Sequence, residues 1–256
     1  MLHGQINFNS SGLNGENLSN PTSLAFGPDG KLYVSQQDGK ILQYTVSRDG
    51  ASPGNGTYSV TSTSTINLIK NNVPNHNDDG ANNSTQQRQV TGIYVGGTSA
   101  NPVLYVSSSD WRISVGVDSG LDTNSGVLSK LTWNGSAWIK VDLVRGLPRC
   151  EENHSTNGMD IFTKNNNTYL LLQQGGNTNK GAPSNNFSGT SETFLSSSIL
   201  IINLTQLDNM PVYTDPRTNS NYVYDLPTLD DPTRANITNS NSNFPYPSGH
   251  PMYNGN

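Results

Sequence analysis

Cysteine is nearly absent from this chain, which has only Cys150 among 256 residues, so no intrachain disulfide can form. Charged residues are also scarce, at 13%, and the net charge is −5. Because Lys and Arg form no cluster, nucleic acid is not an expected partner. No apolar run is long enough to cross a bilayer, so we expect no membrane span.

Apolar residues make up only 32% of the chain, against the roughly 45–50% (Gly included) of ordinary globular proteins. Asn, Ser, Thr and Gly take their place. This composition favours short strands joined by long uncharged loops, and the 3.6-residue periodicity of helices is almost absent. The chain is therefore expected to be all-β.

A strand–turn–strand pattern occurs three times. The first copy has apolar Leu24 and Phe26, the breaker segment Pro28–Gly30, and then a second apolar stretch, which is typical of a β-hairpin. Equivalent threonines mark the three copies at intervals of roughly 65–70 residues: Thr22, Thr91 and Thr156.

Antiparallel sheets repeated at a fixed period are typical of a β-propeller, with one sheet, or blade, per repeat. We predict a partial propeller over residues 21–226, after a polar lead-in at 1–20 and before an irregular Pro-, Asn- and Ser-rich tail at 227–256. About three blades are expected, at 21–70, 90–145 and 155–205. A propeller closes with typically four to eight blades, so the missing blades must come from the rest of a longer chain or from other chains.

The compartment is inferred from sequons and composition. Eleven Asn-x-Ser/Thr sequons occur, where this composition gives about seven by chance. With little Lys and much Asn, Ser and Thr, we expect an extracellular or cell-surface protein. The start of the chain resembles no secretory leader, so a leader was removed or the numbering begins inside a longer protein. Candidate glycosylation sites are Asn9, Asn55, Asn134, Asn186 and Asn236.

Two loops between the repeats are rich in side-chain oxygens. Asp78 and Asp79 lie in one, and Asp122 and Asn124 lie in the other. Calcium takes six to eight oxygen ligands, often from such loops, so both are candidate metal sites. Neither has the EF-hand spacing, and Asn and Asp also favour ordinary turns, which is the alternative.

The densest polar segment contains Arg149 and His154, just before the first strand of the third repeat. A neutral imidazole beside carboxylates is suited to act as a general base near pH 7. The alternative is that His154 hydrogen-bonds the loop backbone within a solvated rim. Cys150 is either a nucleophile or a plain loop residue, and Trp111 either stacks on a sugar or packs in the core.

Five segments carry a family resemblance: Asn20–Val34, Arg88–Ile93, Gly146–His154, Asn157–Gly158 and Gln174–Asn179. Together they resemble the soluble glucose/sorbosone dehydrogenases, over roughly residues 18–234. This resemblance implies a six-bladed β-propeller that uses pyrroloquinoline quinone and calcium. It also agrees with a secreted protein, because one branch of the family is secreted.

By position, the resemblance implies that His154 is the base that takes the sugar hydroxyl proton while hydride moves to the quinone. It places Gln89 in the same pocket. Gln174, Arg149 and Trp111 are further candidates for the pocket, and Gln174 stands where the family has an acid near the histidine. The family's later blades carry most cofactor ligands, so the resemblance leaves open whether this chain alone is an enzyme.

Two functions therefore compete. The first is a secreted quinone-dependent sugar dehydrogenase, acting on a small sugar or glycan once its ring is complete. The second is a non-catalytic extracellular module that binds carbohydrate or protein or builds an assembly. Both predict that the loops around Gln89, His154 and Gln174 converge at one end of the blades.

Overall fold

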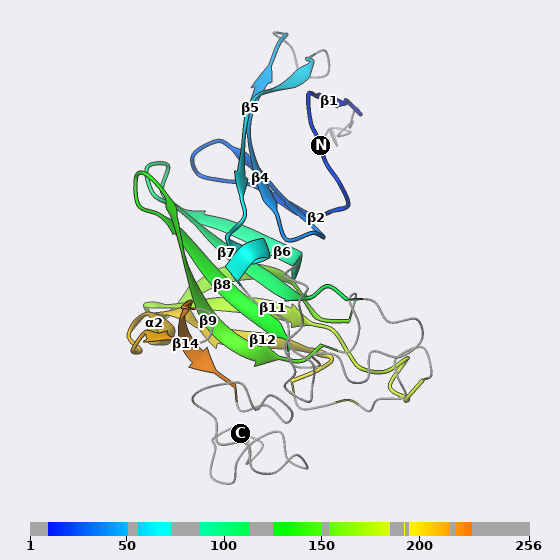
Figure 1. Ribbon diagram of the computed structural model, residues 1–256, viewed down its shortest axis with the longest axis vertical. Helices are drawn as coiled ribbons and strands as arrows, with labels where there is room; N and C mark the ends of the chain where they lie inside the picture. Colours follow the sequence, from blue (N-terminus) through cyan, green and yellow to red (C-terminus); the bar gives the residue numbers. More distant parts are fainter. Residues whose placement is uncertain are drawn as a thin grey trace, which may run out of the picture.

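The computed structural model describes residues 10–50, 56–72, 88–112, 125–149, 154–184, 192, 195–215 and 219–226. These residues form three β-sheets and two short helices (Figure 1). The all-β prediction is confirmed. Within these ranges no helix is long and apolar enough to span a membrane. The predicted tail at 227–256 lies outside the described residues.

The first sheet has the strand order β1-β5-β4-β3-β2. Its strands are β1 (Leu13–Asn14), β2 (Pro21–Phe26), β3 (Leu32–Gln36), β4 (Ile41–Arg48) and β5 (Tyr58–Ile66), and helix α1 (Leu68–Asn72) follows. Gly30 closes the predicted turn with φ 76°, a conformation that favours glycine. Strand β5 could not be predicted from apolar alternation, because its residues are mostly Ser and Thr and mostly exposed.

The second sheet has the order β13-β14-β9-β8-β7-β6. Its strands are β6 (Arg88–Gly97), β7 (Pro102–Asp110), β8 (Gly126–Trp133), β9 (Trp138–Leu147), β13 (Tyr213–Thr214) and β14 (Asn221–Asp225). Trp133 pairs with Trp138 across the β8–β9 hairpin. The N–H of Asn134 donates to the carbonyl of Ala137 at 3.1 Å, so the central residues of the turn are Gly135 and Ser136, of which only Gly135 has a positive φ.

The third sheet has the order β10-β11-β12. Its strands are β10 (Thr156–Lys164), β11 (Asn167–Gln174) and β12 (Ser198–Asn203), and helix α2 (Leu204–Asp208) follows directly. Almost no helix was expected, and α2 has only five residues. It forms because the Asn203 side chain caps it by accepting from the backbone N–H of Gln206 at 3.0 Å.

The three equivalent threonines mark the same local irregularity in each sheet. Strands β2, β6 and β10 each carry a register shift at the threonine or directly after it. The Thr22 hydroxyl lies 2.9 Å from that of Ser35, and the Thr91 hydroxyl lies 3.2 Å from that of Ser107. The sequence repeat is thus a structural repeat, with a β-bulge in the first strand of each copy.

The sheets pack face to face, one after another along the long axis of the molecule (Figure 1). One apolar cluster lies between the first and second sheets, and another lies between the second and third. Strand β6, at the edge of the second sheet, contacts both other sheets. Its Ile93 N–H lies 3.4 Å from the hydroxyl of Ser23 in β2, and its Thr91 hydroxyl donates to the carbonyl of Thr156 in β10. On the other side, the hydroxyl of Ser107 in β7 donates to the carbonyl of Asn157 in β10 at 2.7 Å.

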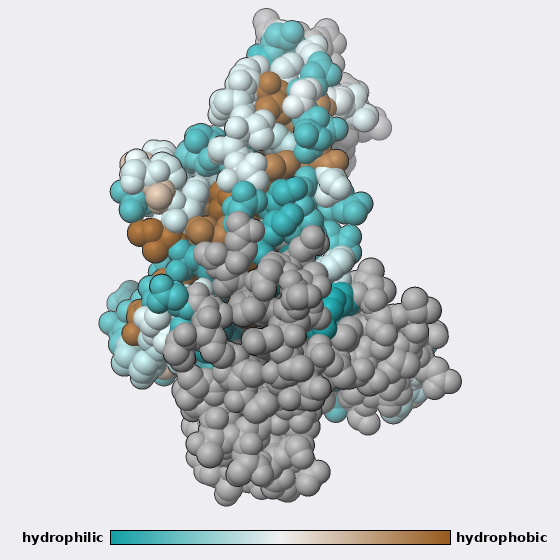
Figure 2. Space-filling model, in the orientation of Figure 1, coloured by the Kyte–Doolittle hydropathy of each residue, from teal (hydrophilic) through white to brown (hydrophobic). Residues whose placement is uncertain are grey.

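Large apolar side chains remain exposed on the two outermost sheets. Leu24 and Phe26 of the first sheet are 66% and 63% exposed, and Ile199 and Ile201 of the third sheet are each 65% exposed. In Figure 2, brown hydrophobic residues lie in several groups among teal and white ones on the side of the molecule that is drawn. Both outermost sheets therefore retain apolar surface that further packing would cover.

Candidate functional site

The starts of β6, β8 and β10 and the ends of β7, β9 and β11 lie at the same end of the second and third sheets. We call this the polar end, because hydrophilic side chains are buried there instead of apolar ones. Such groups need hydrogen-bond partners when water is excluded. Its buried polar residues are Arg88, Gln89, Ser108, Ser109, Asp110, Ser125, Arg149, Ser155, Thr156 and Gln174.

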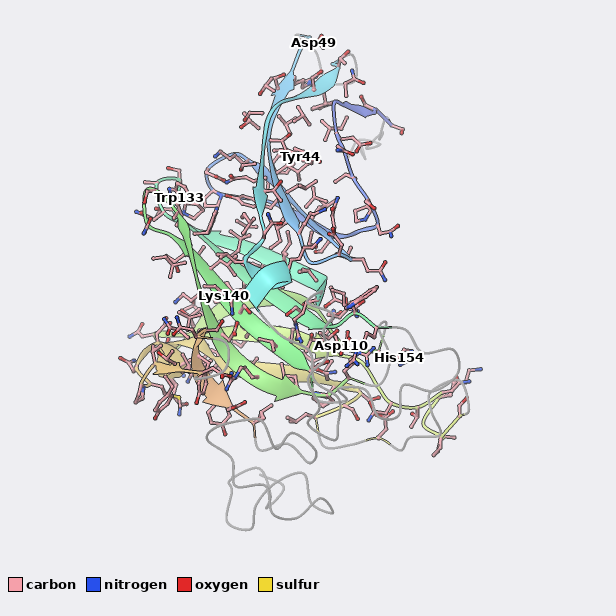
Figure 3. The ribbon with its side chains drawn as sticks, viewed as in Figure 1. Tyr44, Asp49, Asp110, Trp133, Lys140 and His154 are labelled. Carbon is pink, nitrogen blue, oxygen red and sulfur yellow. The ribbon has the colours of Figure 1, made fainter. Side chains whose placement is uncertain are left out.

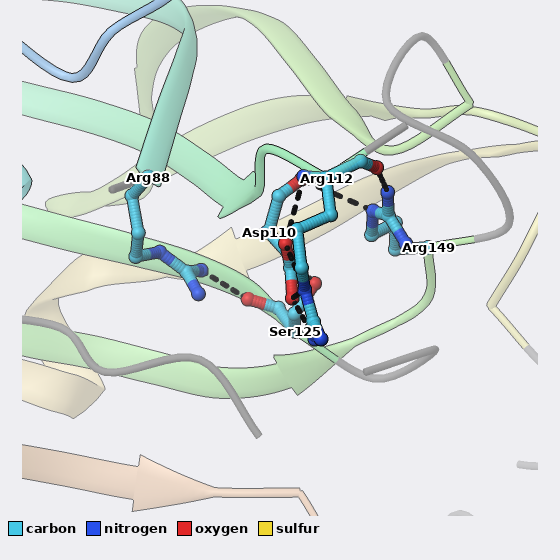
Figure 4. Close-up of polar contacts among 5 residues, drawn as sticks. All are labelled: Arg88, Asp110, Arg112, Ser125 and Arg149. Atoms are coloured by element: carbon cyan, nitrogen blue, oxygen red, sulfur yellow. Dashed lines mark hydrogen bonds and ion pairs between the residues drawn. The ribbon is translucent and has the colours of Figure 1, made fainter. Parts of the chain in front are cut away.

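Arg88 is the first residue of β6 and is 1% exposed. Its Nη2 atom donates to the carbonyl of Ser108 at 3.1 Å and also to the carbonyl of Ser125, and its Nε donates to the Ser108 hydroxyl at 3.4 Å. A buried guanidinium thereby bridges the end of β7 to the residue before β8 (Figure 4). These contacts fix the backbone on which the neighbouring polar side chains stand.

Asp110 ends β7 and is fully buried. Its carboxylate accepts from the Nε, the Nη2 and the backbone N–H of Arg112, with the two Nε contacts at 2.8 and 3.0 Å. The guanidinium of Arg149 donates to the carbonyl of Asp110 at 3.1 Å and to that of Arg112 at 2.5 Å (Figure 4). Arg149, a predicted pocket residue, thus ties the end of β9 to the end of β7.

Gln89 follows Arg88 and is 2% exposed. Its side-chain amide donates to the hydroxyl of Ser109 at 3.1 Å, on the strand opposite. From the third sheet, the hydroxyl of Thr156 donates to the carbonyl of Ser108, next to Ser109, at 3.3 Å. This chain of contacts connects Gln89 to the start of β10, where the predicted base lies.

His154 lies two residues before β10 and is half-buried. Its Nδ1 atom is 2.6 Å from the carbonyl oxygen of Gly176. A carbonyl only accepts, so Nδ1 carries the proton, and in a neutral ring the lone pair is then on Nε2. The loop-backbone contact that we gave as the alternative role is therefore present, and it also sets the tautomer that a base acting through Nε2 requires.

Gly175 holds the backbone of His154 in place. Its N–H donates to the carbonyl of Ser155 at 2.8 Å. A Cβ atom at this position would lie 2.9 Å from backbone atoms of both His154 and Ser155, closer than real Cβ contacts. Only glycine therefore lets the segment after β11 approach the histidine this closely.

Gln174 ends β11, pairs with Thr156 and is 5% exposed. Its amide nitrogen donates to the carbonyl of Pro148 at 2.8 Å, so among the described contacts it does not orient the imidazole of His154. Its buried Oε1 oxygen has no hydrogen-bond partner in the described part of the chain. Gln174 thus ties the end of β11 to the segment after β9, directly before the Gly175 that lies against the backbone of His154.

Glu192 was not predicted, and it holds the loop that contacts His154. Its carboxylate accepts from the N–H of Asn177 at 2.9 Å, from the hydroxyl of Ser196 at 2.5 Å, and from the hydroxyl of Thr178. Burial favours the protonated form, but these hydrogen bonds outweigh it and lower the pKa of Glu192 to about 2. An acid is thus present near the histidine, acting through the loop.

The polar end brings together Gln89, Arg149, His154 and Gln174 of the predicted site. Trp111, the fifth candidate, follows Asp110 and is half-buried, and its indole N–H has no acceptor among the described residues. Figure 3 shows His154 and Asp110 at the opposite end of the second sheet from Trp133. Arg88, Asp110 and Glu192 were missed, although the first adjoins Gln89 and the second ends a run of three serines.

The proposed metal ligands Asp78, Asp79, Asp122 and Asn124 lie outside the described residues, as does Cys150. In the parts of the chain that the structure describes, no group of three or more His, Cys, Asp or Glu side chains could hold a metal ion. Four of the five glycosylation candidates also lie outside those parts: Asn9, Asn55, Asn186 and Asn236. The fifth, Asn134, is exposed in the β8–β9 turn, where its side-chain oxygen accepts from the N–H of Ser136 at 3.0 Å.

No protein-family model matches this chain, and no curated protein matches it. Among solved structures, the chain is similar to a carbohydrate-active enzyme of family AA12 from Trichoderma reesei, described as a calcium structure. The two are 16% identical, with a TM-score of 0.43. The similarity covers 82% of this chain and 41% of that chain, so this chain spans less than half of that protein's length.

Proposed function

We propose that this chain is part of an extracellular sugar dehydrogenase that uses a quinone, of the soluble glucose/sorbosone dehydrogenase type. One observation carries the proposal. Gln89, His154 and Gln174, which the sequence resemblance assigns to one pocket, stand at neighbouring strand ends of the polar end. Their placement at one end of the sheets supports a shared pocket.

In this proposal the three stacked sheets are blades of a propeller. The exposed apolar residues of the two outermost sheets support it: Leu24, Phe26, Ile199 and Ile201. Burying such a side chain completely contributes about 1.5–3 kcal/mol. Packing of further sheets against both outer surfaces would therefore be favourable. These sheets would come from the rest of a longer chain or from other chains, to give the six blades typical of the family.

His154 acts as the base in this reaction. With Nδ1 donating to Gly176, the Nε2 lone pair takes the proton of the sugar hydroxyl as that carbon is oxidised. Gln174 and Gln89 line the pocket and hydrogen-bond the other hydroxyls of the sugar. The Gly176 carbonyl stabilises the imidazolium that forms, because it accepts from the ring nitrogen opposite the reacting one.

The described residues do not by themselves fit the quinone and the calcium ion. The guanidiniums of Arg88 and Arg149 are directed at backbone carbonyls, and no cluster of metal ligands occurs in the described ranges. When bound, the quinone would accept the hydride. We assign its ligands to the further blades.

The same arginine contacts favour a second candidate, a non-catalytic extracellular module that binds carbohydrate or protein or builds an assembly. If these guanidiniums serve only to hold the strand ends together, the polar end is structural. The two candidates differ in whether the full-length protein oxidises a sugar at all, and whether His154 is required for that oxidation.

The test is dye reduction by the natural full-length protein, supplied with pyrroloquinoline quinone and calcium, over a panel of aldoses. We expect activity with at least one sugar. General-base catalysis contributes roughly 10²–10⁴-fold, so His154→Ala should lower kcat by at least about 100-fold. A folded protein that oxidises no aldose, or a His154→Ala variant with unchanged kcat, would refute the enzyme and favour the binding module.

A glycine pair gives a matched control. Gly175→Ala should lower kcat, because the new Cβ displaces the backbone of His154. Gly158→Ala introduces the same methyl group nearby in β10, where its nearest contact is the side chain of Gln173 at an ordinary 3.4 Å. Equal effects of the two substitutions would contradict the assigned placement of the histidine.

A further inference from the structure

A second site of a different kind lies between the first and second sheets, at the end opposite the polar end. A cleft of about 300 Å³ is lined by Asp29 and Lys31 of the β2–β3 turn, Gln43 of β4, and Trp133 at the end of β8. Pro102 and the β6–β7 turn close its other side. This volume is at the lower end of the roughly 300–1,000 Å³ of ligand pockets. Figure 3 places Trp133 far from His154.

The polar wall of this cleft is held by a chain of short hydrogen bonds. The Ser64 hydroxyl donates to the Oε1 of Gln43 at 2.7 Å, and the amide of Gln43 donates to the Tyr33 hydroxyl at 2.6 Å. Tyr33 in turn donates to the carboxylate of Asp29 at 2.9 Å, and the N–H of Lys31 contacts the other carboxylate oxygen at 3.3 Å. The wall is therefore preorganised before any ligand arrives.

Burial and the hydrogen bond to Asp29 raise the pKa of Tyr33, so its phenol stays protonated and keeps donating to the carboxylate. Each oxygen of Asp29 can still accept a further hydrogen bond. Among the described contacts, the amide of Gln43 uses only one of its two hydrogens. Lys31 adds an ammonium with no ion pair among the described residues. Fixed acceptors and donors thus stand side by side.

The opposite wall is aromatic. Trp133 is half-buried and packs on Trp138, with ring centroids 5.6 Å apart, and Trp138 meets Tyr33 edge to face at 6.2 Å. Contact with its neighbours restrains the indole of Trp133, so little conformational entropy is lost when a ligand stacks on it. One flat apolar wall facing fixed polar groups suits a ring that is apolar on its faces and carries hydroxyls at its edge.

We propose that this cleft binds one pyranose ring of a neutral glycan, as a site separate from the polar end. Trp133 covers a face of the ring, and Asp29 and Gln43 hydrogen-bond adjacent hydroxyls. The charges of Asp29 and Lys31 balance, which favours a neutral sugar over an anionic one. The proposal does not depend on the dehydrogenase assignment, because it uses none of the residues of that site.

The test is saturation-transfer NMR and calorimetry on the full chain, with cellotetraose, xylotetraose, mannotetraose and chitotetraose as probes. We expect at least one probe to bind. Trp133→Ala should then weaken binding roughly tenfold or more through the lost apolar contact, and Asp29→Asn should weaken it by a similar factor through the lost charge-assisted hydrogen bonds. Ala100→Trp, which fills the cleft from the β6–β7 turn, should block binding without removing any proposed contact.

Matched variants keep the test decisive. Tyr213→Ala removes an exposed aromatic side chain elsewhere on the second sheet and should leave binding unchanged. If Trp133→Ala does not fold, Trp133→Phe retains a stacking ring and should bind more tightly than Trp133→Leu. The proposal is overturned if no probe binds, or if binding persists unchanged in both Ala100→Trp and the Trp133 variants.

Discussion

Arg145 joins the C-terminal strands to the second sheet, and its removal should be among the most destabilising substitutions in the described chain. Its two terminal nitrogens contact Asp215 at 2.8 Å and Asp225 at 2.7 Å, with all three side chains at least 92% buried. The guanidinium also lies 3.7 Å from the ring centroid of Tyr222. These contacts attach β13 and β14 to β9, where β14 runs parallel.

Arg145→Met would take the guanidinium away from two buried carboxylates. Breaking a buried ion pair from one side costs about 3–5 kcal/mol, mostly because the remaining charge is desolvated and uncompensated. For a domain of this size, each kcal/mol shifts Tm by roughly 2–4 °C, so we expect a loss of about 6–20 °C. Adding Asp215→Asn and Asp225→Asn should recover most of this loss, because the buried charges are then gone.

The assay is thermal and urea unfolding of the full chain, followed by circular dichroism. Lys130→Met is the matched control: its pair with Asp208 has a similar N···O distance of 2.7 Å, but its side chains are 23% and 52% exposed. Exposed pairs contribute about 0–1 kcal/mol. The reasoning is refuted if Arg145→Met is no more destabilising than Lys130→Met, or if the triple variant is less stable than the single one.

Glycine substitutions in the sheets and a titration of Glu192 test the close backbone contacts and the loop beside His154. Gly92→Ala should destabilise the chain in urea, because its Cβ would lie 2.5 Å from a backbone carbonyl of β10; an unchanged midpoint would contradict the close packing of β6 on β10. Gly39→Ala should cost more than Gly30→Ala in the same assay: both glycines have positive φ, at roughly 1–2 kcal/mol of strain each, but only at Gly39 would the Cβ meet the carbonyl of Arg88. The depressed pKa of Glu192 means that its carboxylate stabilises the fold above pH about 4.5 and loses this contribution as the pH falls toward 2. NMR titration of the side-chain carboxyl of Glu192 should show that low midpoint, and a midpoint near 4.5 would mean that the loop hydrogen bonds are absent in solution.

The hairpins of the fold could be predicted from the sequence, but strand β5 and the pairing of β14 could not. Leu24 and Phe26 alternate before a Pro-Asp-Gly turn, so local rules were sufficient for β2 and β3. Strand β5 has a polar sequence, because most of its side chains face solvent. The parallel pairing of β14 with β9 depends on Arg145, which contacts acids 70 and 80 residues away. Contacts over such a sequence separation cannot be predicted from a local pattern.

The candidate site shows the same division. His154 and Gln89 could be predicted because they belong to segments that resemble a known family. The roles of Asp110 and Arg88 could not be predicted, because a buried carboxylate or guanidinium is recognisable only once the strand ends that surround it are known. Glu192 could not be predicted for another reason. It accepts from a backbone N–H and from hydroxyls, which occur throughout the chain, so its role depends on where the loop lies.

The repeat itself explains why one end of the sheets is polar. The second strand of each copy ends in a buried polar side chain: Gln36, Asp110 and Gln174, at 3%, 0% and 5% exposure. Gln36 and Gln174 pair with the first strand directly at its bulge, and Asp110 pairs with Arg88, two residues before the bulge of β6. The architecture thus supplies a buried polar position at the end of each sheet, and the residue that occupies it sets the local charge. Among these three positions the carboxylate occurs only in the middle sheet, and the arginines of the polar end gather around it.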